Sequence, residues 1–260
     1  MHNISDYLAL AKRLAREAGL YALDAQKSGL QITSKTNEFD LVTHVDKHNE
    51  EFIRSEIALR YPDHAFLGEE DGASGGGEVK WIVDPIDGTV NYAHGMPIWC
   101  VSIGVEVAGV IECGAIYDPN RDEMFWAEKG DGAYLNDNPI NVSKIAALPR
   151  SLLVTGFPYN IAENPDHAHE RFTAFLRRGI MVRRLGSAAL DLCYVAAGRF
   201  DGFFEGKLSP WDTAAGSLIL REAGGMLTGY NGSDHSIYSD PIVASNGVLH
   251  QQMLEVIQSV

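Results

Sequence analysis

The sequence is poor in the features that mark secreted, membrane-embedded or disulfide-stabilised proteins. Its 260 residues contain three cysteines, Cys100, Cys113 and Cys193, with no CxxC pair, which predicts free buried thiols and excludes a disulfide framework or a zinc–cysteine site. No basic-then-apolar leader opens the chain. No apolar run reaches the roughly 18–20 residues that cross a bilayer. We therefore expect a cytoplasmic protein without a membrane partner.

Basic residues are scarce relative to acidic ones. The chain has 21 Lys and Arg against 35 Asp and Glu, a formal net charge of −14. Direct nucleic-acid binding normally requires a basic face, and this balance argues against it. Bound metal ions would neutralise part of the excess negative charge. Carboxylates in metal-binding arrangements are therefore the features of most interest.

Neither an internal repeat nor a Pro/Ser-rich linker divides the chain, and its length suits one large domain or two small ones. The first half predicts two amphipathic helices, at 4–28 and 45–60, on an antiparallel sheet. Strands and helices alternate in the second half, which is typical of an α/β layer. We expect one catalytic domain over 1–260, with sub-domains of about 1–145 and 146–260 and the site at their junction.

One stretch, from Trp81 to Asn91, places two carboxylates on a stiff turn at the end of an apolar strand. Asp84 ends the apolar run, and Pro85 cannot donate a ladder hydrogen bond. Asp87 follows, and Gly88 can adopt backbone angles closed to other residues. Such a turn could hold divalent metal on one side and phosphate on the other. Asp-Pro and Asp-Gly are also ordinary turn signals, so the choice depends on carboxylates from elsewhere.

Two further carboxylates, Glu69 and Asp212, occupy positions from which they could reach such a turn. Glu69 begins an acidic triplet at the end of a short apolar strand. Asp212 lies in the first turn of a predicted helix over 210–223. The following Ala214-Ala215-Gly216 leaves little side-chain bulk, so this helix end can approach another backbone or a ligand closely. Each acid could equally be a surface turn or a helix-start residue.

A third acid, Asp46, lies in the first turn of the helix predicted over 45–60, where the helix dipole favours a carboxylate. His44 and His48 flank it in sequence. Residues two apart do not share a helix face, so the pattern does not favour a histidine metal site. From the residues alone, Asp46 is best explained as a helix-start acid.

Taken together, these blocks resemble the signatures of the inositol monophosphatase family. The resemblance is carried, in order and over essentially the whole chain, by Leu67-Gly68-Glu69-Glu70, by the 81–91 stretch, and by the segment from Trp211 to Gly225. It implies a magnesium-dependent, lithium-sensitive phosphomonoesterase that forms a homodimer. The implied fold is a layered αβαβα sandwich of the α+β or α/β class.

Position by position, the resemblance implies metal ligands at Glu69, Asp84, the Ile86 backbone carbonyl, Asp87 and Asp212. These hard oxygen donors suit Mg²⁺. Packed within about 4 Å, each pair of the four carboxylates would repel by about 4 kcal/mol at an effective dielectric of about 20. Two or three Mg²⁺ ions per site would remove that conflict.

The resemblance also assigns the reaction and its remaining residues. Thr89 and Asp46 would orient the attacking water beside Glu69, and Lys35 matches a lysine near the metals that does not bind them directly. Metal ions about 3.5–4 Å apart would activate that water and neutralise the leaving oxygen. The phosphate and its alcohol would contact Asp87, Gly88, Thr89, Gly186, Ala188, Glu205 and Asp212.

The sequence defines the alcohol of the substrate less well than it defines the metal ligands. The segment from Thr155 to Tyr159 resembles bacterial and plant members, and a substrate-contacting serine of the animal enzymes has no clear match. The leading hypothesis is inositol monophosphate. The same metal core also serves fructose-1,6-bisphosphate, histidinol phosphate and adenosine 3′,5′-bisphosphate, and the short glycine-rich segment 72–77 favours small polyols. A non-catalytic metal-binding regulatory protein is the alternative of another class.

Overall fold

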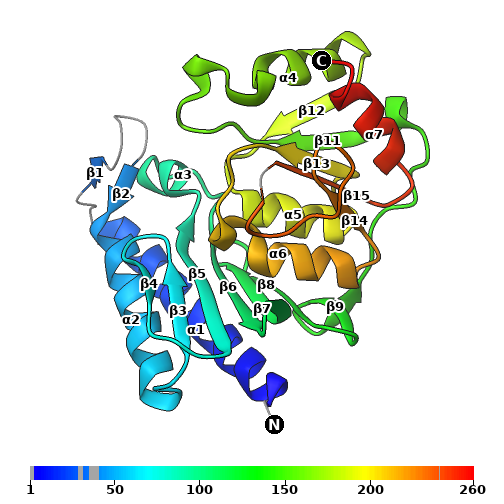
Figure 1. The fold of residues 1–260 in the computed structure, drawn as a ribbon. Helices are drawn as coiled ribbons and strands as arrows, with labels where there is room; N and C mark the ends of the chain where they lie inside the picture. Colours follow the sequence, from blue (N-terminus) through cyan, green and yellow to red (C-terminus); the bar gives the residue numbers. More distant parts are fainter. Residues whose placement is uncertain (1–2, 29–31, 35–40, 240) are drawn as a thin grey trace.

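The structure is a computed structural model that describes residues 3–28, 32–34, 41–239 and 241–260. Over these residues, two large β-sheets and the helices around them form five layers in the order helix, sheet, helix, sheet, helix (Figure 1). The layered mixed α/β fold predicted from the sequence is confirmed.

The first layer consists of helices α1 (Ile4–Ser28) and α2 (His44–Arg60), which cover one face of the larger sheet (Figure 1). Both lie within one residue of their predicted ranges. Their apolar side chains recur at helical spacing, and those of Leu14 and Ile53 are fully buried. The helices are therefore held by packing against strands in the centre of the sheet.

The larger sheet has eight strands, and antiparallel pairing predominates. Its order is β10 (Asn138–Ile140), β9 (Gly132–Leu135), β8 (Glu123–Glu128), β7 (Val110–Asp118), β6 (Cys100–Val107), β5 (Val79–Asp87), β3 (Ala65–Gly68) and β4 (Gly72–Ser74). The pair β3–β5 is parallel, unlike the purely antiparallel prediction. Strand β4 runs antiparallel to β3, so the following strand β5 can run in the same direction as β3. Strands β3 and β5 therefore end at the same edge of the sheet.

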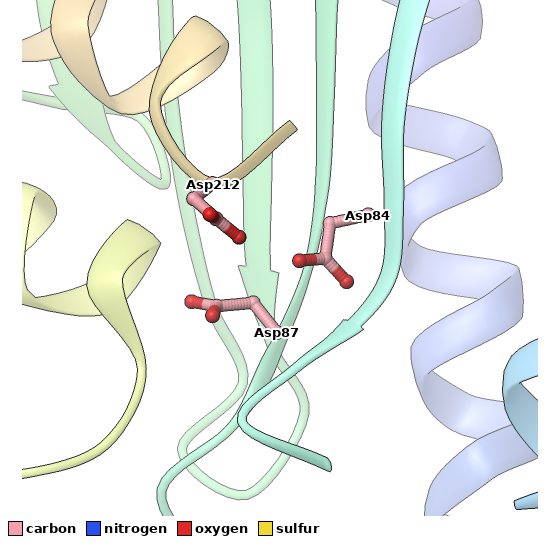
Figure 2. A group of neighbouring side chains, drawn as sticks. All are labelled: Asp84, Asp87 and Asp212. Atoms are coloured by element: carbon pink, nitrogen blue, oxygen red, sulfur yellow. The ribbon is translucent and has the colours of Figure 1, made fainter. Parts of the chain in front are cut away.

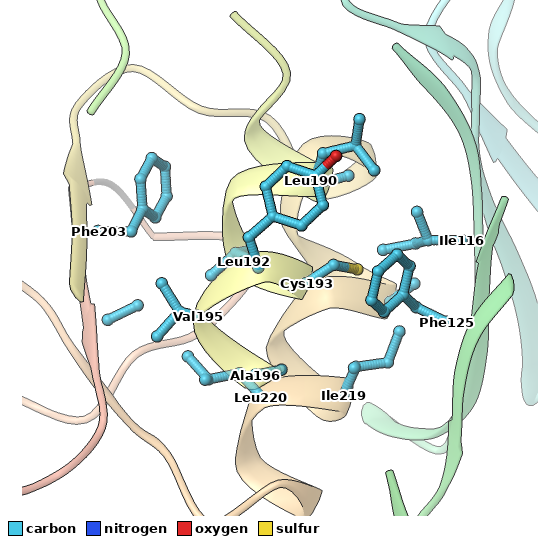
Figure 3. Packing of buried hydrophobic residues seen from close by; sticks show 14 of the residues in the cluster. Ile116, Phe125, Leu190, Leu192, Cys193, Val195, Ala196, Phe203, Ile219 and Leu220 are labelled. Carbon is cyan, nitrogen blue, oxygen red and sulfur yellow. The ribbon is translucent and has the colours of Figure 1, made fainter. Parts of the chain in front are cut away.

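The central layer contains α5 (Ala188–Ala196) and α6 (Pro210–Glu222), which are packed between the two sheets (Figure 3). A Cβ added at Gly104 or Gly114 would lie 2.9 Å from Ala214 or Ala215. Strands β6 and β7 thus touch the backbone of α6. The prediction that small residues let this helix approach another backbone closely is confirmed.

The second sheet has five strands in the order β12 (Met181–Arg184), β11 (Leu152–Thr155), β13 (Gly202–Glu205), β15 (Ile242–Ser245) and β14 (Met226–Thr228). Strand β11 pairs in parallel with β12 and β13, and the other pairs are antiparallel. Helices α4 (Ala168–Arg177) and α7 (His250–Ile257) form the outer layer (Figure 1).

Smaller elements complete the described part of the chain. Strands β1 (Ile32–Ser34) and β2 (Leu41–Thr43) form a two-stranded sheet. The short helix α3 (Thr89–Ala93) follows β5 directly, and one-turn 3₁₀ helices occupy Leu148–Arg150, Ile161–Glu163 and Pro165–His167. Among the helices of the described residues, none combines the length and the apolar character needed to span a membrane.

Candidate active site

The end of β5 forms an irregular turn that presents two carboxylates. Its register with β6 shifts between Asp84 and Asp87, at the point where Pro85 has no N–H to donate. The Asp84 Oδ1 atom accepts a hydrogen bond from the Ile86 N–H at 3.0 Å. Gly88 then has a φ of 97°, which glycine adopts without strain. The chain therefore turns sharply from β5 into α3.

Three carboxylates meet at this turn. Asp84 and Asp87 from β5 and Asp212 from the first turn of α6 each offer an oxygen, and these oxygens all lie within 4.8 Å of one another (Figure 2). The Asp212 Oδ2 atom accepts from the Ser209 N–H at 2.6 Å, which completes a capping box at the start of α6. Asp212 is thus a helix-start acid and also a member of the cluster.

Glu69 lies outside this group of three but at the same edge of the sheet. In the parallel pairing of β3 with β5, Gly68 is opposite Val83, so Glu69 and Asp84 are the next residues of the two strands. The carbonyl of Ile86 lies 2.9 Å from the Thr89 hydroxyl and has two lone pairs, so it can also bind a metal. All five predicted ligand positions thus come from the end of β3, the 84–87 turn and the start of α6.

Asp46 and Thr89 form a buried pair next to the turn. Thr89 Oγ1 lies 2.9 Å from Asp46 Oδ1, which links α2 to α3. The other oxygen of Asp46 accepts from the Thr43 N–H at 2.8 Å and from the Thr43 hydroxyl at 2.6 Å. Asp46 therefore caps α2, as its sequence position suggests, and also fixes the hydroxyl of Thr89.

Asp87 is oriented by groups from the second half of the chain. Its Oδ2 atom accepts from the Ser187 hydroxyl at 2.5 Å and the Ala189 N–H at 2.8 Å, and the Cys100 thiol lies 3.8 Å away. Burial raises the pKa of the Asp87 carboxyl, and the bonds from Ser187 and Ala189 oppose this shift. A metal cation beside Asp87 would favour its ionised form.

A cavity of about 450 Å³ opens from the carboxylate group towards the second sheet. It is lined by most of the predicted substrate contacts: Asp87, Gly88, Gly186, Ala188, Glu205 and Asp212. Thr89 is 3% exposed and does not itself line the cavity. Lys35 lies outside the described residues.

Several residues of this site escape sequence reasoning. Ser187 is the residue before α5, but its side chain makes no capping hydrogen bond and binds Asp87 instead, which its local sequence does not indicate. Arg184 and Lys207 also line the cavity, and nothing in their local sequence indicates this. Gly156 lies against Glu205, because an added Cβ would be 2.1 Å from Glu205 Oε2. The segment from Thr155 to Tyr159 therefore packs against the far end of the cavity.

The donor atoms at the 84–87 turn are suited to a hard divalent cation. Each member of the group of three offers a carboxylate oxygen, and Mg²⁺ prefers carboxylates and carbonyls to nitrogen or sulfur. Without a cation, three carboxylates this close would repel one another strongly. The residues present therefore fit a Mg²⁺ site.

Comparison with known proteins identifies the family. The sequence model of the inositol monophosphatase family matches residues 3–260. The chain belongs to the inositol monophosphatase family. The Nus factor SuhB of Pasteurella multocida is 41% identical over 255 residues, covering 96% of this chain and 95% of that protein. The inositol-1-monophosphatase of Synechocystis sp. is 40% identical over 257 residues, covering 98% and 90%.

Solved structures of the inositol monophosphatase family agree with the fold. The inositol monophosphatase from Anabaena (Nostoc) sp. PCC 7120 superposes with a TM-score of 0.90 at 40% identity, covering 100% of this chain and 98% of that one. Family membership supports a metal-dependent phosphatase. The relatives carry two different functional names, so membership leaves the substrate open.

Proposed function

We propose that this chain is a Mg²⁺-dependent phosphomonoesterase that hydrolyses inositol monophosphate to myo-inositol and phosphate by attack of water at phosphorus. The observation that carries the proposal is the group of three carboxylates, whose oxygens lie within 4.8 Å of one another, two of which, Asp87 and Asp212, line a cavity of about 450 Å³. A cavity of this size suits a small phosphate ester. The inositol-1-monophosphatase of Synechocystis supports the choice of alcohol.

Two or three Mg²⁺ ions would be held by Glu69, Asp84, Asp87, Asp212 and the carbonyl of Ile86. When bound, the metal supplies positive charge that stabilises the phosphoryl oxygens and lowers the pKa of a water. In the family this chemistry is sensitive to Li⁺, and we expect the same here. Lys35 would lie near the metals without binding them.

Thr89 and Asp46 would orient the attacking water. Because Asp46 Oδ2 is already held by both donors of Thr43, its Oδ1 has a fixed direction towards Thr89. A Thr89 hydroxyl that donates to Asp46 turns its lone pairs away from the carboxylate. Those lone pairs can then accept a proton of a water next to Glu69. The pair would thus hold the attacking water beside Glu69, which would raise the rate by orientation.

The phosphate and the alcohol would occupy opposite ends of the cavity. Backbone N–H groups of Gly88 and Thr89 would bind phosphate oxygens. Glu205, at the end of β13, would accept hydrogen bonds from hydroxyl groups of the alcohol, beside Gly186 and Ala188. Asp87 and Asp212 also line the cavity. Each would therefore contact both the metal and the departing alcohol.

We further propose that residues 1–260 form one catalytic domain with the site at the junction of its two halves. The active protein would be a cytoplasmic homodimer, as the family resemblance implies. Fructose-1,6-bisphosphate, histidinol phosphate and adenosine 3′,5′-bisphosphate remain the alternative substrates. Each could use the same carboxylates, since they differ in the alcohol and not in the phosphate.

The test is release of inorganic phosphate from a panel of these esters, with and without Mg²⁺ and Li⁺. We expect Mg²⁺-dependent turnover that is fastest with inositol monophosphate and inhibited by Li⁺. Faster turnover of another ester would replace the substrate but keep the chemistry. An absence of turnover across the panel, in a protein that is folded and binds Mg²⁺, would contradict the phosphatase assignment.

A second candidate is a regulatory role in transcription, because the relative from Pasteurella multocida is named a Nus factor. This role would need a protein partner, since the net charge of −14 disfavours direct contact with nucleic acid. The two functions are separable in one variant. Asp84→Asn should lower phosphate release on the order of 10³-fold, and a regulatory activity that survives in this variant would be independent of catalysis.

A further inference from the structure

Glu50 is a buried carboxylate that holds the backbone directly after Glu69. It lies on α2, one helical turn after Asp46, and is 1% exposed. Its Oε2 atom accepts from the Glu70 N–H at 2.7 Å, and its Oε1 atom accepts from the Asp71 N–H at 2.9 Å. Both oxygens are therefore bound to consecutive peptide groups of the turn that follows β3.

The fit between Glu50 and this turn is close. A Cβ added at Gly68 would lie 2.4 Å from Glu50 Oε2, so a side chain at that position would displace the carboxylate. Arg54, one turn further along α2, donates to Glu50 Oε1 at 2.5 Å and pairs with Asp71 at 2.9 Å. A buried charge is costly unless it is paired and hydrogen-bonded, and Glu50 meets both conditions.

Helix α2 contacts three segments of the first half of the chain, and these segments meet around the 84–87 turn. Asp46 bonds Thr89 at the start of α3. The Asn49 side-chain amide donates to the Pro85 carbonyl at 3.4 Å, within the turn itself. Glu50 bonds the turn after β3. One rigid helix thus sets the positions of all three segments relative to one another.

We propose that Glu50 is a positioning residue that fixes Glu69 for metal binding. The proposal rests on the assignment of Glu69 as a Mg²⁺ ligand under the proposed function. The Glu70 N–H belongs to the peptide group formed by the Glu69 carbonyl, so rotation of this peptide group would break its hydrogen bond to Glu50. Groups that orient metal ligands typically contribute about 10- to 100-fold to metal affinity. Glu50 would contribute in this way without touching the metal or the substrate.

The test is Glu50→Gln, with Mg²⁺ affinity measured by calorimetric titration and amide hydrogen exchange measured on the metal-free protein. A glutamine offers one accepting oxygen, so one of the two N–H groups loses its partner. We expect Mg²⁺ affinity to fall by about tenfold or more and the amides of Glu70 and Asp71 to exchange faster. The matched control is Glu51→Gln, which removes the same charge from the adjacent exposed position of α2 and should change neither quantity.

Two further variants separate the possible outcomes. If Glu69→Gln weakens Mg²⁺ binding while a folded Glu50→Gln does not, the role of Glu50 is overturned and the proposed function stands. If Glu69→Gln leaves Mg²⁺ binding and turnover unchanged, the ligand assignment itself fails. Should Glu50→Gln not fold, Glu50→Asp keeps the charge beside Arg54 but is shorter by one methylene. It should show the same loss of affinity, and wild-type affinity would overturn the proposal.

Discussion

The two sides of the site are built differently. On the side of the 84–87 turn, Asp46, Asp87 and Glu50 each accept at least two hydrogen bonds at 2.5–2.9 Å from buried or part-buried groups. On the opposite side, the cavity is bounded by Glu205, Lys207 and the loop segment from Gly156 to Asn160. The metal side is thus fixed by hydrogen bonds to its carboxylates, whereas the alcohol side is lined largely by a loop segment.

This difference predicts how the two sides would divide the chemical step and the choice of phosphate ester between them. Electrostatic preorganisation accelerates the chemical step and depends in part on residues such as Asp46 and Asp84, which do not line the cavity. Discrimination between alcohols depends on the few groups at the far end of the cavity. Substitutions on the metal side should therefore affect all substrates alike, and substitutions on the alcohol side should affect some more than others.

The largest effect is expected from Asp84→Asn. This change keeps the hydrogen bond that the Ile86 N–H donates to position 84 but removes the negative charge from the cluster. We expect turnover of every ester to fall on the order of 10³-fold while the thermal unfolding temperature stays the same or rises, since carboxylate repulsion is relieved. Phosphate release and calorimetry check both points, and near-normal turnover would remove Asp84 from the site.

Thr89→Ala should give the next largest effect. The variant loses the hydroxyl that lies 2.9 Å from both Asp46 Oδ1 and the Ile86 carbonyl. We expect kcat to fall about 100-fold with little change in KM, because the hydroxyl orients water and not the alcohol. Thr89→Ser keeps the hydroxyl and serves as the control. A change confined to KM would refute the role of Thr89.

Glu205→Gln tests the alcohol side. A hydrogen bond to a charged acceptor contributes about 1.5–3 kcal/mol, so kcat/KM for polyol phosphates should fall by roughly tenfold or more. Esters without neighbouring hydroxyls should be affected less, and the Mg²⁺ concentration dependence should stay the same. Gly156→Ala should act similarly, because its methyl group would overlap the Glu205 carboxylate. An unchanged ranking of substrates in Glu205→Gln would exclude Glu205 from substrate binding.

The smallest effect concerns stability towards acid and lies in the second half of the chain. Burial, followed by the Arg221 charge, lowers the pKa of His235 to about 4, and burial also lowers the pKa of His250. Because the unfolded chain binds protons at these histidines below about 6.5, the free energy of unfolding should fall as pH drops from 6.5 towards 4. Above pH 6.5 these two histidines should have no effect.

Urea unfolding at several pH values checks this prediction. Neither ring nitrogen of His235 has a hydrogen-bond partner among the described residues, so His235→Phe should fold and show a weaker pH dependence between 4 and 6.5. His250, which lies 2.9 Å from the hydroxyls of Thr228 and Ser245, should account for part of the remainder. Identical pH dependence in the wild type and His235→Phe would contradict the lowered pKa of His235.

Local sequence patterns predict the parts of the site that depend on local geometry. The turn at Asp84 and Asp87 follows from Pro85 and Gly88, and the approach of Asp212 follows from the small residues after it. The position of Asp46 predicts a residue that caps the start of α2. The structure adds a second role, because Asp46 also lies within hydrogen-bond distance of the Thr89 hydroxyl. A local pattern reports the first role only, because the second depends on how α2 and α3 pack.

Contacts between distant segments could not be predicted. Ser187 meets Asp87 across 100 positions of sequence, and Glu50 meets the turn after β3 across 20. Nothing near Ser187 or Glu50 in the sequence indicates these partners, because they depend on the register of the strands and on the placement of α5 and α2. The parallel pairing of β3 with β5 was missed for the same reason, since both strands have ordinary apolar patterns.

The most direct test of the central claim is a crystal structure of the protein with Mn²⁺ in place of Mg²⁺, using anomalous scattering to locate the metal. We predict peaks contacted by carboxylate oxygens of Asp84, Asp87 and Asp212, with Glu69 and the Ile86 carbonyl completing the ligand set. Peaks elsewhere, or none at this group under conditions that support phosphate release, would contradict the account.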